Sequence, residues 1–488
     1  STIPREMKTA TLLSLLLLPL LLLGCGPDEE GAGTAAPAAS RPTQADNAPR
    51  HVFFITVDTL RADHMSAYGY GRETSPRLDR LGASGVVFDQ AIAQWPKTGS
   101  SFAAVFTGRY PQTTGLTHKA ALRIPAEYLT LPELFKENGF TTLAVNSNAV
   151  LALDFGWNTG FDEYLQTWGY GDFPRDPRKF RQFAHAGKVN ELALPLLEKH
   201  RKAERLFVWL HYSDPHAPYM LPDGVENPFL NDSLFKGDET VPRKVTRGQP
   251  LDGRTDLKYY VAQYDANILV TDVAIQAVLD RIRQLGLLDD SLIVFTADHG
   301  ESLGEHDSWF EHGPLPYNTT AHVPLFVVGR GLPAGRRVGS PVELVDLYPT
   351  LRDLFFPGRK VEGLEGNSLV PLLAPGEPGD AARAGFCCAF SEAGRRPNYF
   401  QSVQDGGWKL IYNEHRRRDD PARPGGFELY DLKADPLETK NLATAKAEEV
   451  RRLRKQLFAW RKSPRSDASE DGDDAETRKA LEALGYIN

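Results

Sequence analysis

Short runs of aliphatic, β-branched and aromatic residues recur along the chain and predict buried strands. The runs are "HVFFITV" from His51, "TTLAVNS" from Thr141, "RLFVWLHY" from Arg205, "SLIVFTA" from Ser291 and "VPLFVVG" from Val323. Each is short and apolar throughout, which is typical of strands that are covered on both faces.

Helical patterns lie between these runs. In "TLPELFKENGF", Thr130 and Glu133 have the spacing of a capping box and Gly139 is a stop signal. A longer pattern runs from Asp256 to Gly286 with apolar residues at helical spacing. This alternation predicts an α/β fold, with a mainly parallel sheet sandwiched by helices. In such a sheet, functional residues gather at the carboxyl ends of the strands.

The pattern of apolar and polar residues changes from about residue 377. Two alternating segments, "WKLIYNEH" and "FELYDLK", predict a small antiparallel sheet subdomain over 377–462. Residues 463–488 are expected to form an acidic linker and a terminal helix.

The N-terminus predicts export. "MKTATLLSLLLLPLLLLGCG" has a Lys and a Leu-rich stretch too short to span a bilayer, and it ends in Leu-Leu-Gly-Cys. This resembles a bacterial lipoprotein signal over 1–24, with Cys25 as the lipidated residue; an ordinary signal peptide with a chance cysteine is the alternative. Residues 25–49 read as a disordered tether. We therefore expect a protein lipid-anchored to a bacterial membrane, facing the periplasm or the cell exterior.

Composition excludes some partners. The chain has 488 residues with 56 Lys and Arg against 64 Asp and Glu, and its net charge of -8 argues against nucleic-acid binding. Of the three cysteines, the adjacent Cys387 and Cys388 are expected to be buried in a strand.

Polar residues follow three of the predicted strands. Asp58 ends the first, Asp298 and His299 follow "LIVFTA", and the middle strand delivers three residues, His211, Asp214 and His216. Converging carboxylates and imidazoles are what a metal-assisted hydrolase needs. Taken singly, each Asp is equally explained as a helix cap.

The stretch "WPKTGSSFAAVFTG" raises a second possibility. Ser100 or Ser101 is expected to cap a helix that begins near "FAAVF". The Thr98 hydroxyl, beside Lys97, is a candidate nucleophile if a metal lowers its pKa; a simple capping role is the alternative.

Several motifs, in order, resemble the sulfatase family of the alkaline-phosphatase superfamily. They include "FFITVDTLRADHMSAYGYGRETSPRLDRL", "FTGRYPQTTGL", "HYSDPHAPY", "FTADHGESLGEH" and "ELYDLKADPLETKNLA", and the resemblance runs from His51 to Ala443. It implies a catalytic domain over 50–376 with a large mixed sheet, a small C-terminal four-stranded sheet and one divalent metal. Asp58, Asp298 and His299 match the family's metal ligands, and His216 and His312 match positions that hold the ester group.

The chain also departs from the family. Thr98 stands where sulfatases carry the Cys that becomes formylglycine, with Ser100 and Phe102 at the following Pro and Arg positions. "VNSNAVL", with Asn146 and Asn148, replaces the family's Lys-Trp-His stretch, and Thr59 replaces the second Asp of an Asp pair. Formylglycine cannot form at Thr98.

These residues lead to a hypothesis: a sulfate- or phosphate-ester hydrolase with Thr98 as nucleophile. A threonine ester cannot collapse to an aldehyde, which favours phosphate slightly. The cofactor is one divalent ion, calcium, manganese or zinc, with Thr98 a further ligand. Substrate contacts are assigned to Lys97, His211 and Asn148, and the substrate is a small-molecule, glycan or lipid ester.

Three alternatives stay open. One is an envelope transferase that moves a phospho-head-group to an acceptor, and another is a binding protein that kept the fold after losing catalysis. The third is a two-metal hydrolase that uses His211, Asp214 or His216 with His312.

Overall fold

The structure is a computed structural model. It describes residues 49–117, 123–168, 185–231, 240–242, 254–373, 383–391, 398–413 and 426–462. The predicted signal segment, Cys25 and the terminal helix lie outside these residues.

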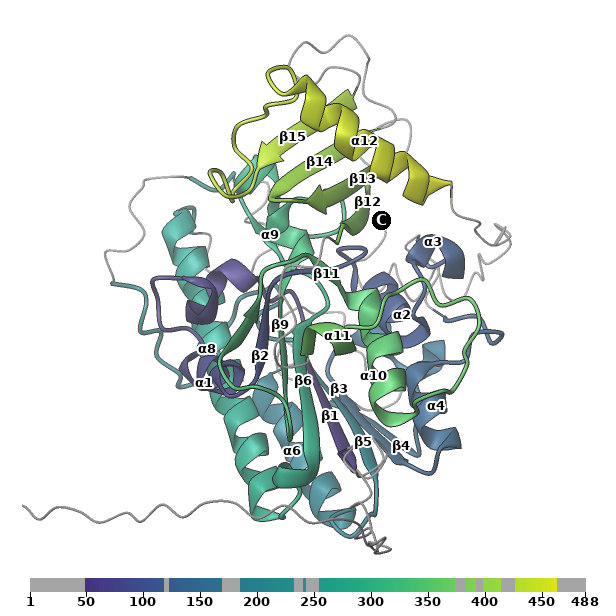
Figure 1. Cartoon of the computed structure of the whole chain (residues 1–488). Coiled ribbons are helices and arrows are strands. Elements are labelled where there is room, and N and C mark those ends of the chain that lie inside the picture. Colours follow the sequence, from purple (N-terminus) through teal and green to yellow (C-terminus); the bar gives the residue numbers. More distant parts are fainter. Residues whose placement is uncertain are drawn as a thin grey trace, which may run out of the picture. The chain divides into compact units, whose positions relative to one another are not determined.

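A large mixed sheet forms the centre of the molecule (Figure 1). Its strand order is β10-β2-β9-β6-β1-β5-β3-β4, with β11 also pairing with β2. The strands are β1 (His51–Val57), β2 (Val86–Ile92), β3 (Thr141–Asn146), β4 (Glu163–Gln166), β5 (Leu206–Tyr212), β6 (Ser291–Ala297), β9 (His322–Gly329), β10 (Arg336–Val338) and β11 (Val342–Glu343).

The pairing confirms the predicted architecture. Strands β6, β1, β5, β3 and β4 are mutually parallel, whereas β9 runs antiparallel to both β6 and β2. The strands of the parallel part are buried along their length, except for the edge strand β4 and Thr141 at the start of β3. The sheet is therefore mixed and mainly parallel, with the apolar runs as its interior strands.

Helices cover both faces of this sheet (Figure 1). Helices α1 (Pro76–Ala83), α6 (Ala186–Lys199) and α8 (Leu257–Gln284) lie on one face. Helices α2 (Thr98–Thr107), α4 (Leu131–Glu137) and α10 (Leu347–Phe355) lie on the other. The short helices are α3 (Pro111–Thr114), α9 (Asn318–Ala321) and α11 (Val370–Leu373), and β7 (Ser302–Leu303) pairs with β8 (Trp309–Glu311).

Local sequence signals fix several helix ends. The Thr130 and Glu133 side chains form the predicted capping box at the start of α4, and the Asp256 side chain accepts from the Tyr259 amide at the start of α8. The expected serine cap of α2 is wrong. The helix begins at Thr98 itself and has no side-chain cap, and the Ser101 hydroxyl lies inside it and donates to the Asp298 carbonyl at 2.7 Å.

The small C-terminal sheet is antiparallel, as predicted, and has four strands in the order β12-β13-β14-β15. They are β12 (Gly385–Ser391), β13 (Asn398–Asp405), β14 (Trp408–Asn413) and β15 (Phe427–Asp431), and α12 (Ala447–Arg461) packs on β13 and β14. Cys387 and Cys388 are buried in β12, as expected. Helices α6 and α12 were missed, although both carry apolar residues at helical spacing: Val189, Leu192, Ala193, Leu196 and Leu197 in α6, and Val450, Leu453 and Leu457 in α12.

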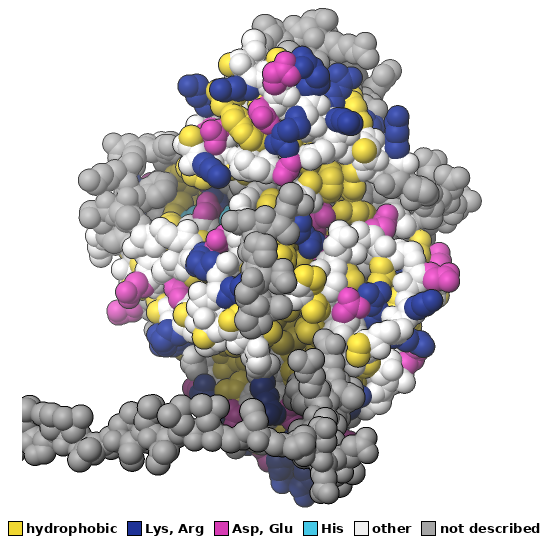
Figure 2. Space-filling view, in the orientation of Figure 1, with side chains coloured by type: hydrophobic (Ala, Val, Ile, Leu, Met, Phe, Trp, Pro, Cys, Tyr) yellow, Lys and Arg dark blue, Asp and Glu magenta, His cyan; other side chains and the backbone are white. Residues whose placement is uncertain are grey.

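The described surface carries charges of both signs, and Lys and Arg side chains gather over α12 (Figure 2). Among the helices of the described residues, we find none that combines the length and the apolar character needed to cross a bilayer.

Candidate active site

Three adjacent strands deliver the candidate residues to one edge of the sheet. β6, β1 and β5 are neighbours in parallel register, so their carboxyl ends bring together Asp298, Asp58 and His211. The α2 helix starts over the same edge with Thr98. All four side chains are almost completely buried. The site predicted from strand ends is therefore assembled by the fold.

Asp58, His211 and Asp298 form a compact donor cluster. One ligand atom from each lies within 4.8 Å of the others. Asp58 Oδ1, Asp298 Oδ2 and His211 Nε2 are buried and have no hydrogen-bond partner in the structure. Buried polar atoms are normally satisfied, so inward-facing orphan atoms on two carboxylates and an imidazole fit a divalent cation.

The two carboxyl groups have different electrostatic environments. Burial opposes ionisation of Asp58, but the charges of the nearby imidazoles, His216 foremost, hold the pKa of its carboxyl below the usual value. Burial and the charge of Asp58 raise the pKa of Asp298 to about 8. Asp298 Oδ1 accepts from the amides of Thr59 and His299, at 3.2 and 2.9 Å, which fixes the carboxylate plane. Two close carboxylates of this kind are typical of a metal site.

His299 lies between this cluster and the nucleophile candidate. Its Nε2 is 3.3 Å from Asp298 Oδ2, 3.9 Å from Asp58 Oδ1 and 3.3 Å from Thr98 Oγ1. Its Nδ1 lies 2.9 Å from the Gly300 carbonyl, an acceptor that requires the proton on Nδ1. Burial lowers the pKa of His299 to about 4, so the ring is neutral and Nε2 presents a lone pair to the site.

Asn148 and Lys97 are two further polar residues of the candidate site. Asn148 Nδ2 donates to Asp58 Oδ2 at 2.5 Å, so its amide orients a carboxylate. A Cβ atom placed on Gly313, next to His312, would lie 2.1 Å from Lys97 Cε. The Lys97 side chain therefore occupies space that only a glycine at 313 leaves open, and its charge helps to lower the pKa of His312.

Two further imidazoles border the site. The His312 ring centroid lies 4.3 Å from that of His299 and 5.1 Å from that of His216. His312 Nδ1 lies 2.9 Å from Glu301 Oε1, and His216 Nδ1 donates to the Ala217 carbonyl. Both rings are thus held through Nδ1. Burial first, and then the proximity of the His299 ring and of the Lys97 ammonium, lowers the pKa of His312 well below its usual value.

Nearly all candidates predicted from sequence meet at this edge; their individual roles stay predictions. Asp214 does not belong to the group, because its Oδ2 accepts from the Ala186 amide at the start of α6. Among the residues that the structure describes, Asp58, His211 and Asp298 are the one compact group of acid and imidazole side chains with ligand spacing, and His312 is not part of it. The geometry therefore favours a single cation over the two-metal alternative.

Sequence reasoning missed three supporting residues. Glu301, two positions after His299, holds His312, and burial, then the charge of Asp58, raises its pKa to about 8. Arg61 is buried and pairs with Asp63 and Glu305 beneath the site. Thr56 contacts His211 Nδ1 at 2.9 Å. The only signal for Thr56 was its place two residues before Asp58 on the same strand.

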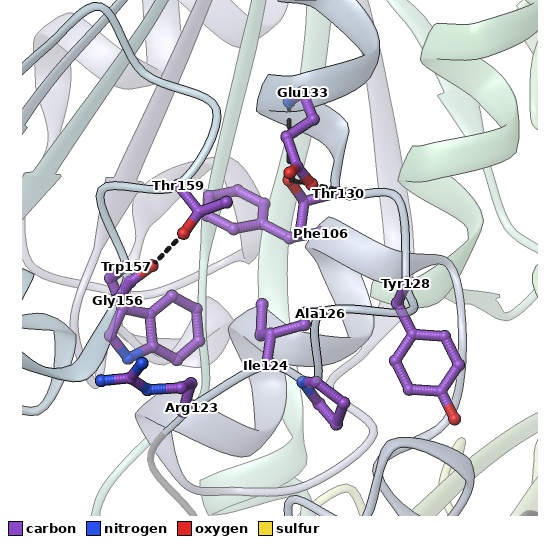
Figure 3. Close-up of a pocket in the computed structure, with 11 residues that line it drawn as sticks. Phe106, Arg123, Ile124, Ala126, Tyr128, Thr130, Glu133, Gly156, Trp157 and Thr159 are labelled. Carbon is purple, nitrogen blue, oxygen red and sulfur yellow. Dashed lines mark hydrogen bonds between the residues drawn. The ribbon is translucent and has the colours of Figure 1, made fainter.

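A separate pocket of about 260 Å³ lies beside α2 (Figure 3). Trp157 and Tyr128 stand on opposite sides with Ile124 and Ala126 between them, and Phe106 of α2 forms part of the wall. None of the strand-end residues lines it. This pocket is therefore not the candidate active site.

Comparison with known proteins agrees with the fold. The family model described as Sulfatase matches residues 50–356. A protein of Formosa agariphila named "Sulfatase" is 26% identical over 389 residues, covering 70% of this chain and 74% of that protein. An N-acetylglucosamine-6-O-sulfatase of Bacteroides thetaiotaomicron is 23% identical, covering 95% of this chain and 93% of its own length. The solved structure of a phosphonate monoester hydrolase of Agrobacterium radiobacter superposes with a TM-score of 0.64 at 20% identity, covering 85% of this chain and 95% of that one.

Proposed function

We propose, from the premise that this chain belongs to the sulfatase family, that it is a metal-dependent hydrolase whose nucleophile is Thr98. Its substrate is a sulfate or phosphorus ester. The family and the relatives make it an ester hydrolase; the nucleophile, the metal and the choice of ester are the proposal.

One observation carries the proposal. Thr98 Oγ1 lies 3.3 Å from His299 Nε2, and the same nitrogen lies next to the buried carboxylates of Asp58 and Asp298. The hydroxyl is held by the first turn of α2, where backbone N–H groups favour a bound anion. A nucleophile, an activating site and an anion-binding helix start thus coincide.

Asp58, Asp298 and His299 would hold the divalent cation, and His211 is within reach of it. When bound, such a cation lowers the pKa of a neighbouring hydroxyl and neutralises negative charge on a transferred group. Two buried carboxylates with orphan oxygens fit that role.

Residues of this chain carry out the attack on the ester, the protonation of the leaving group and the binding of the anionic oxygens. The Thr98 hydroxyl gives up its proton to water, its oxygen forms a bond to sulfur or phosphorus, and the bond to the leaving oxygen breaks. His216 or His312 gives that oxygen a proton, and Lys97 pairs with the anionic oxygens of the ester. Water then breaks the bond between the Thr98 oxygen and sulfur or phosphorus, which regenerates the hydroxyl.

Threonine favours phosphorus esters over sulfate. A formylglycine hydrate releases sulfate by collapsing to the aldehyde, and threonine has no such route. Attack by water on a phosphothreonine needs only alignment and charge stabilisation. The structural likeness to a protein named phosphonate monoester hydrolase adds that substrate type to the candidates.

We also propose that the protein is exported and lipid-anchored through Cys25. This part rests on the sequence of residues 1–49 alone.

A substrate panel tests the function. Aryl sulfate, aryl phosphate, bis-aryl phosphate and aryl phosphonate monoester are assayed with metal-loaded wild type and with Thr98→Ala. We expect turnover of at least one phosphorus ester that Thr98→Ala lacks. Turnover that needs an added alcohol acceptor indicates a transferase, and no turnover together with no bound metal indicates a binding protein.

A further inference from the structure

We infer that His211 supplies a nitrogen ligand to the cation through Nε2, and that the Thr56 hydroxyl is the positioning group that makes this possible. The inference rests on the proposed function in one respect, since it takes the cation site as given. It changes the donor set and, with it, the class of metal that the site selects.

The position of His211 suits a ligand better than a substrate contact. Its side chain is completely buried, and Nε2 lies 3.8 Å from Asp58 Oδ2 without a hydrogen bond to any group. A separation of this size is too long for a hydrogen bond but fits two ligands that share one ion. Because the His211 side chain is completely buried next to Asp58, its imidazole cannot reach the leaving group of an ester.

The hydrogen bonds of Thr56 are compatible with a His211 that is protonated on Nδ1 and turns Nε2 toward the cation. Thr56 Oγ1 accepts from Trp209 Nε1 at 2.9 Å and lies 2.9 Å from His211 Nδ1 and 3.4 Å from the Leu210 carbonyl. A hydroxyl has one proton and two lone pairs. Trp209 Nε1–H fills one lone pair, and we infer that His211 Nδ1–H fills the other while the Thr56 proton goes to the Leu210 carbonyl.

This arrangement satisfies every group only if His211 carries its proton on Nδ1. Nε2 then presents a lone pair to Asp58 and Asp298, where a cation is the only partner of suitable charge. The opposite tautomer would bury an Nε2–H without an acceptor. Hydrogen bonds of this kind to the second nitrogen commonly fix a metal-binding histidine.

Phe102 closes the other side of the imidazole. Its ring meets the His211 ring edge to face, with centroids 5.0 Å apart and planes at 85°, and it contacts Trp209 in a similar way. A guanidinium in that space would place a positive charge beside the imidazole and weaken cation binding. The neutral phenyl ring of Phe102 is therefore compatible with cation binding by the neighbouring His211 imidazole.

A nitrogen donor changes metal preference. Calcium takes oxygen ligands, and imidazole suits zinc; manganese prefers oxygen ligands but binds nitrogen and oxygen sites less tightly than zinc does. We expect the order zinc, then manganese, then calcium for affinity at this site.

The experiment uses the full chain, stripped with a chelator and loaded with defined metals in the absence of substrate. Zinc, manganese and calcium affinities are measured by competition with a fluorescent chelator for wild type, Thr56→Val and Thr56→Ser. We expect Thr56→Val to weaken zinc and manganese about 10- to 100-fold. Thr56→Ser keeps the hydroxyl and should bind like wild type, and calcium affinity should change little in both.

A second experiment counts the histidine ligands of the metal by NMR. In ¹⁵N-histidine protein loaded with ¹¹³Cd, wild type should show a nitrogen coupling that His211→Gln lacks. If wild type shows no coupling, if every coupling persists in His211→Gln, or if Thr56→Val binds zinc like wild type, the inference is wrong. Wild type is expected to show two couplings, one from His211 and one from His299, so a wild-type spectrum with fewer than two couplings contradicts the inference even where a variant does not fold.

The outcomes also separate this inference from the proposed function. A protein that shows the His211 coupling but cleaves none of the esters contradicts the function alone. A protein that cleaves an ester while its His211 coupling is absent contradicts the inference alone.

Discussion

The Thr98 hydroxyl lies 3.3 Å from Nε2 of His299. The two residues are far apart in the sequence and meet because α2 begins at the edge of the sheet where β6 ends. The contact places a hydroxyl, rather than the family's modified cysteine, next to the buried carboxylates.

If Thr98 is the nucleophile, Thr98→Ala should lower kcat/KM at least about 10³-fold with its metal content unchanged. Thr98→Ser keeps the hydroxyl and should retain part of the activity. Ser100→Ala removes a hydroxyl from the same turn of α2 and serves as the control. Steady-state kinetics with the best ester of the panel measures all three, and activity in Thr98→Ala would remove the residue from the mechanism.

Removal of the cation should both inactivate and destabilise the protein. Without the ion, two buried carboxyl groups face each other, and the charge of Asp58 opposes ionisation of Asp298. A cation at about 100 times its dissociation constant adds about 2.7 kcal/mol to the free energy of unfolding. Thermal unfolding with and without chelator measures this shift, and readdition of zinc or manganese should restore both Tm and activity. An identical Tm in both conditions would argue against a bound ion.

Gly313→Ala should displace Lys97 and weaken substrate binding. The added methyl group would lie 2.1 Å from Lys97 Cε, and Gly313 also has a φ of 102° that L-residues rarely adopt. If Lys97 pairs with the anionic ester, kcat/KM should fall about 10- to 100-fold, mainly through KM.

The control for that variant is Gly331→Ala. Gly331 has a φ of 83° but has no atom within 4 Å of the added methyl group, so it carries the backbone strain without the contact. Similar kinetics in the two variants would show that strain, and not Lys97, causes the effect.

Much of this fold follows from local sequence. The apolar runs became β1, β3, β5, β6 and β9 because buried strands need continuous apolar residues, and the capping box of α4 needs only Thr130 and Glu133. Asp58 and Asp298 each follow a predicted parallel strand. Because parallel strands end at the same edge of the sheet, these positions predict that the two residues lie close together.

The remaining features depend on contacts that no local pattern encodes. The Ser101 hydroxyl of α2 donates to the Asp298 carbonyl, almost two hundred residues away. The pairing of Glu301 with His312 depends on the turn between β7 and β8. Likewise, the role of Thr56 becomes visible only when β5 places Trp209 and His211 beside it.

Glu343 should make the protein less stable as pH rises. It lies buried between the main sheet and β12, where Tyr110 Oη and the Phe386 amide donate to it. Burial, followed by the charge of Asp346, raises the pKa of Glu343 to about 8 in the folded protein, against an ordinary value of 4.5. The folded state therefore holds a proton that the unfolded state releases. The stability that this proton provides is complete below about pH 4.5 and is lost as pH rises through about 8.

Glu343→Gln tests this directly, because glutamine is neutral at every pH and keeps one carbonyl acceptor. Urea unfolding between pH 5 and pH 9 should show a fall in the free energy of unfolding for wild type that is clearly smaller for Glu343→Gln. Distant buried acids such as Glu301 contribute equally to both proteins, so the difference between the two curves reports Glu343 together with its neighbour Asp346. Glu448→Gln, which changes an exposed carboxylate on α12, should follow wild type throughout. Parallel curves for wild type and Glu343→Gln would mean that Glu343 is ionised in the folded protein, with Arg383 and the surrounding donors compensating its charge.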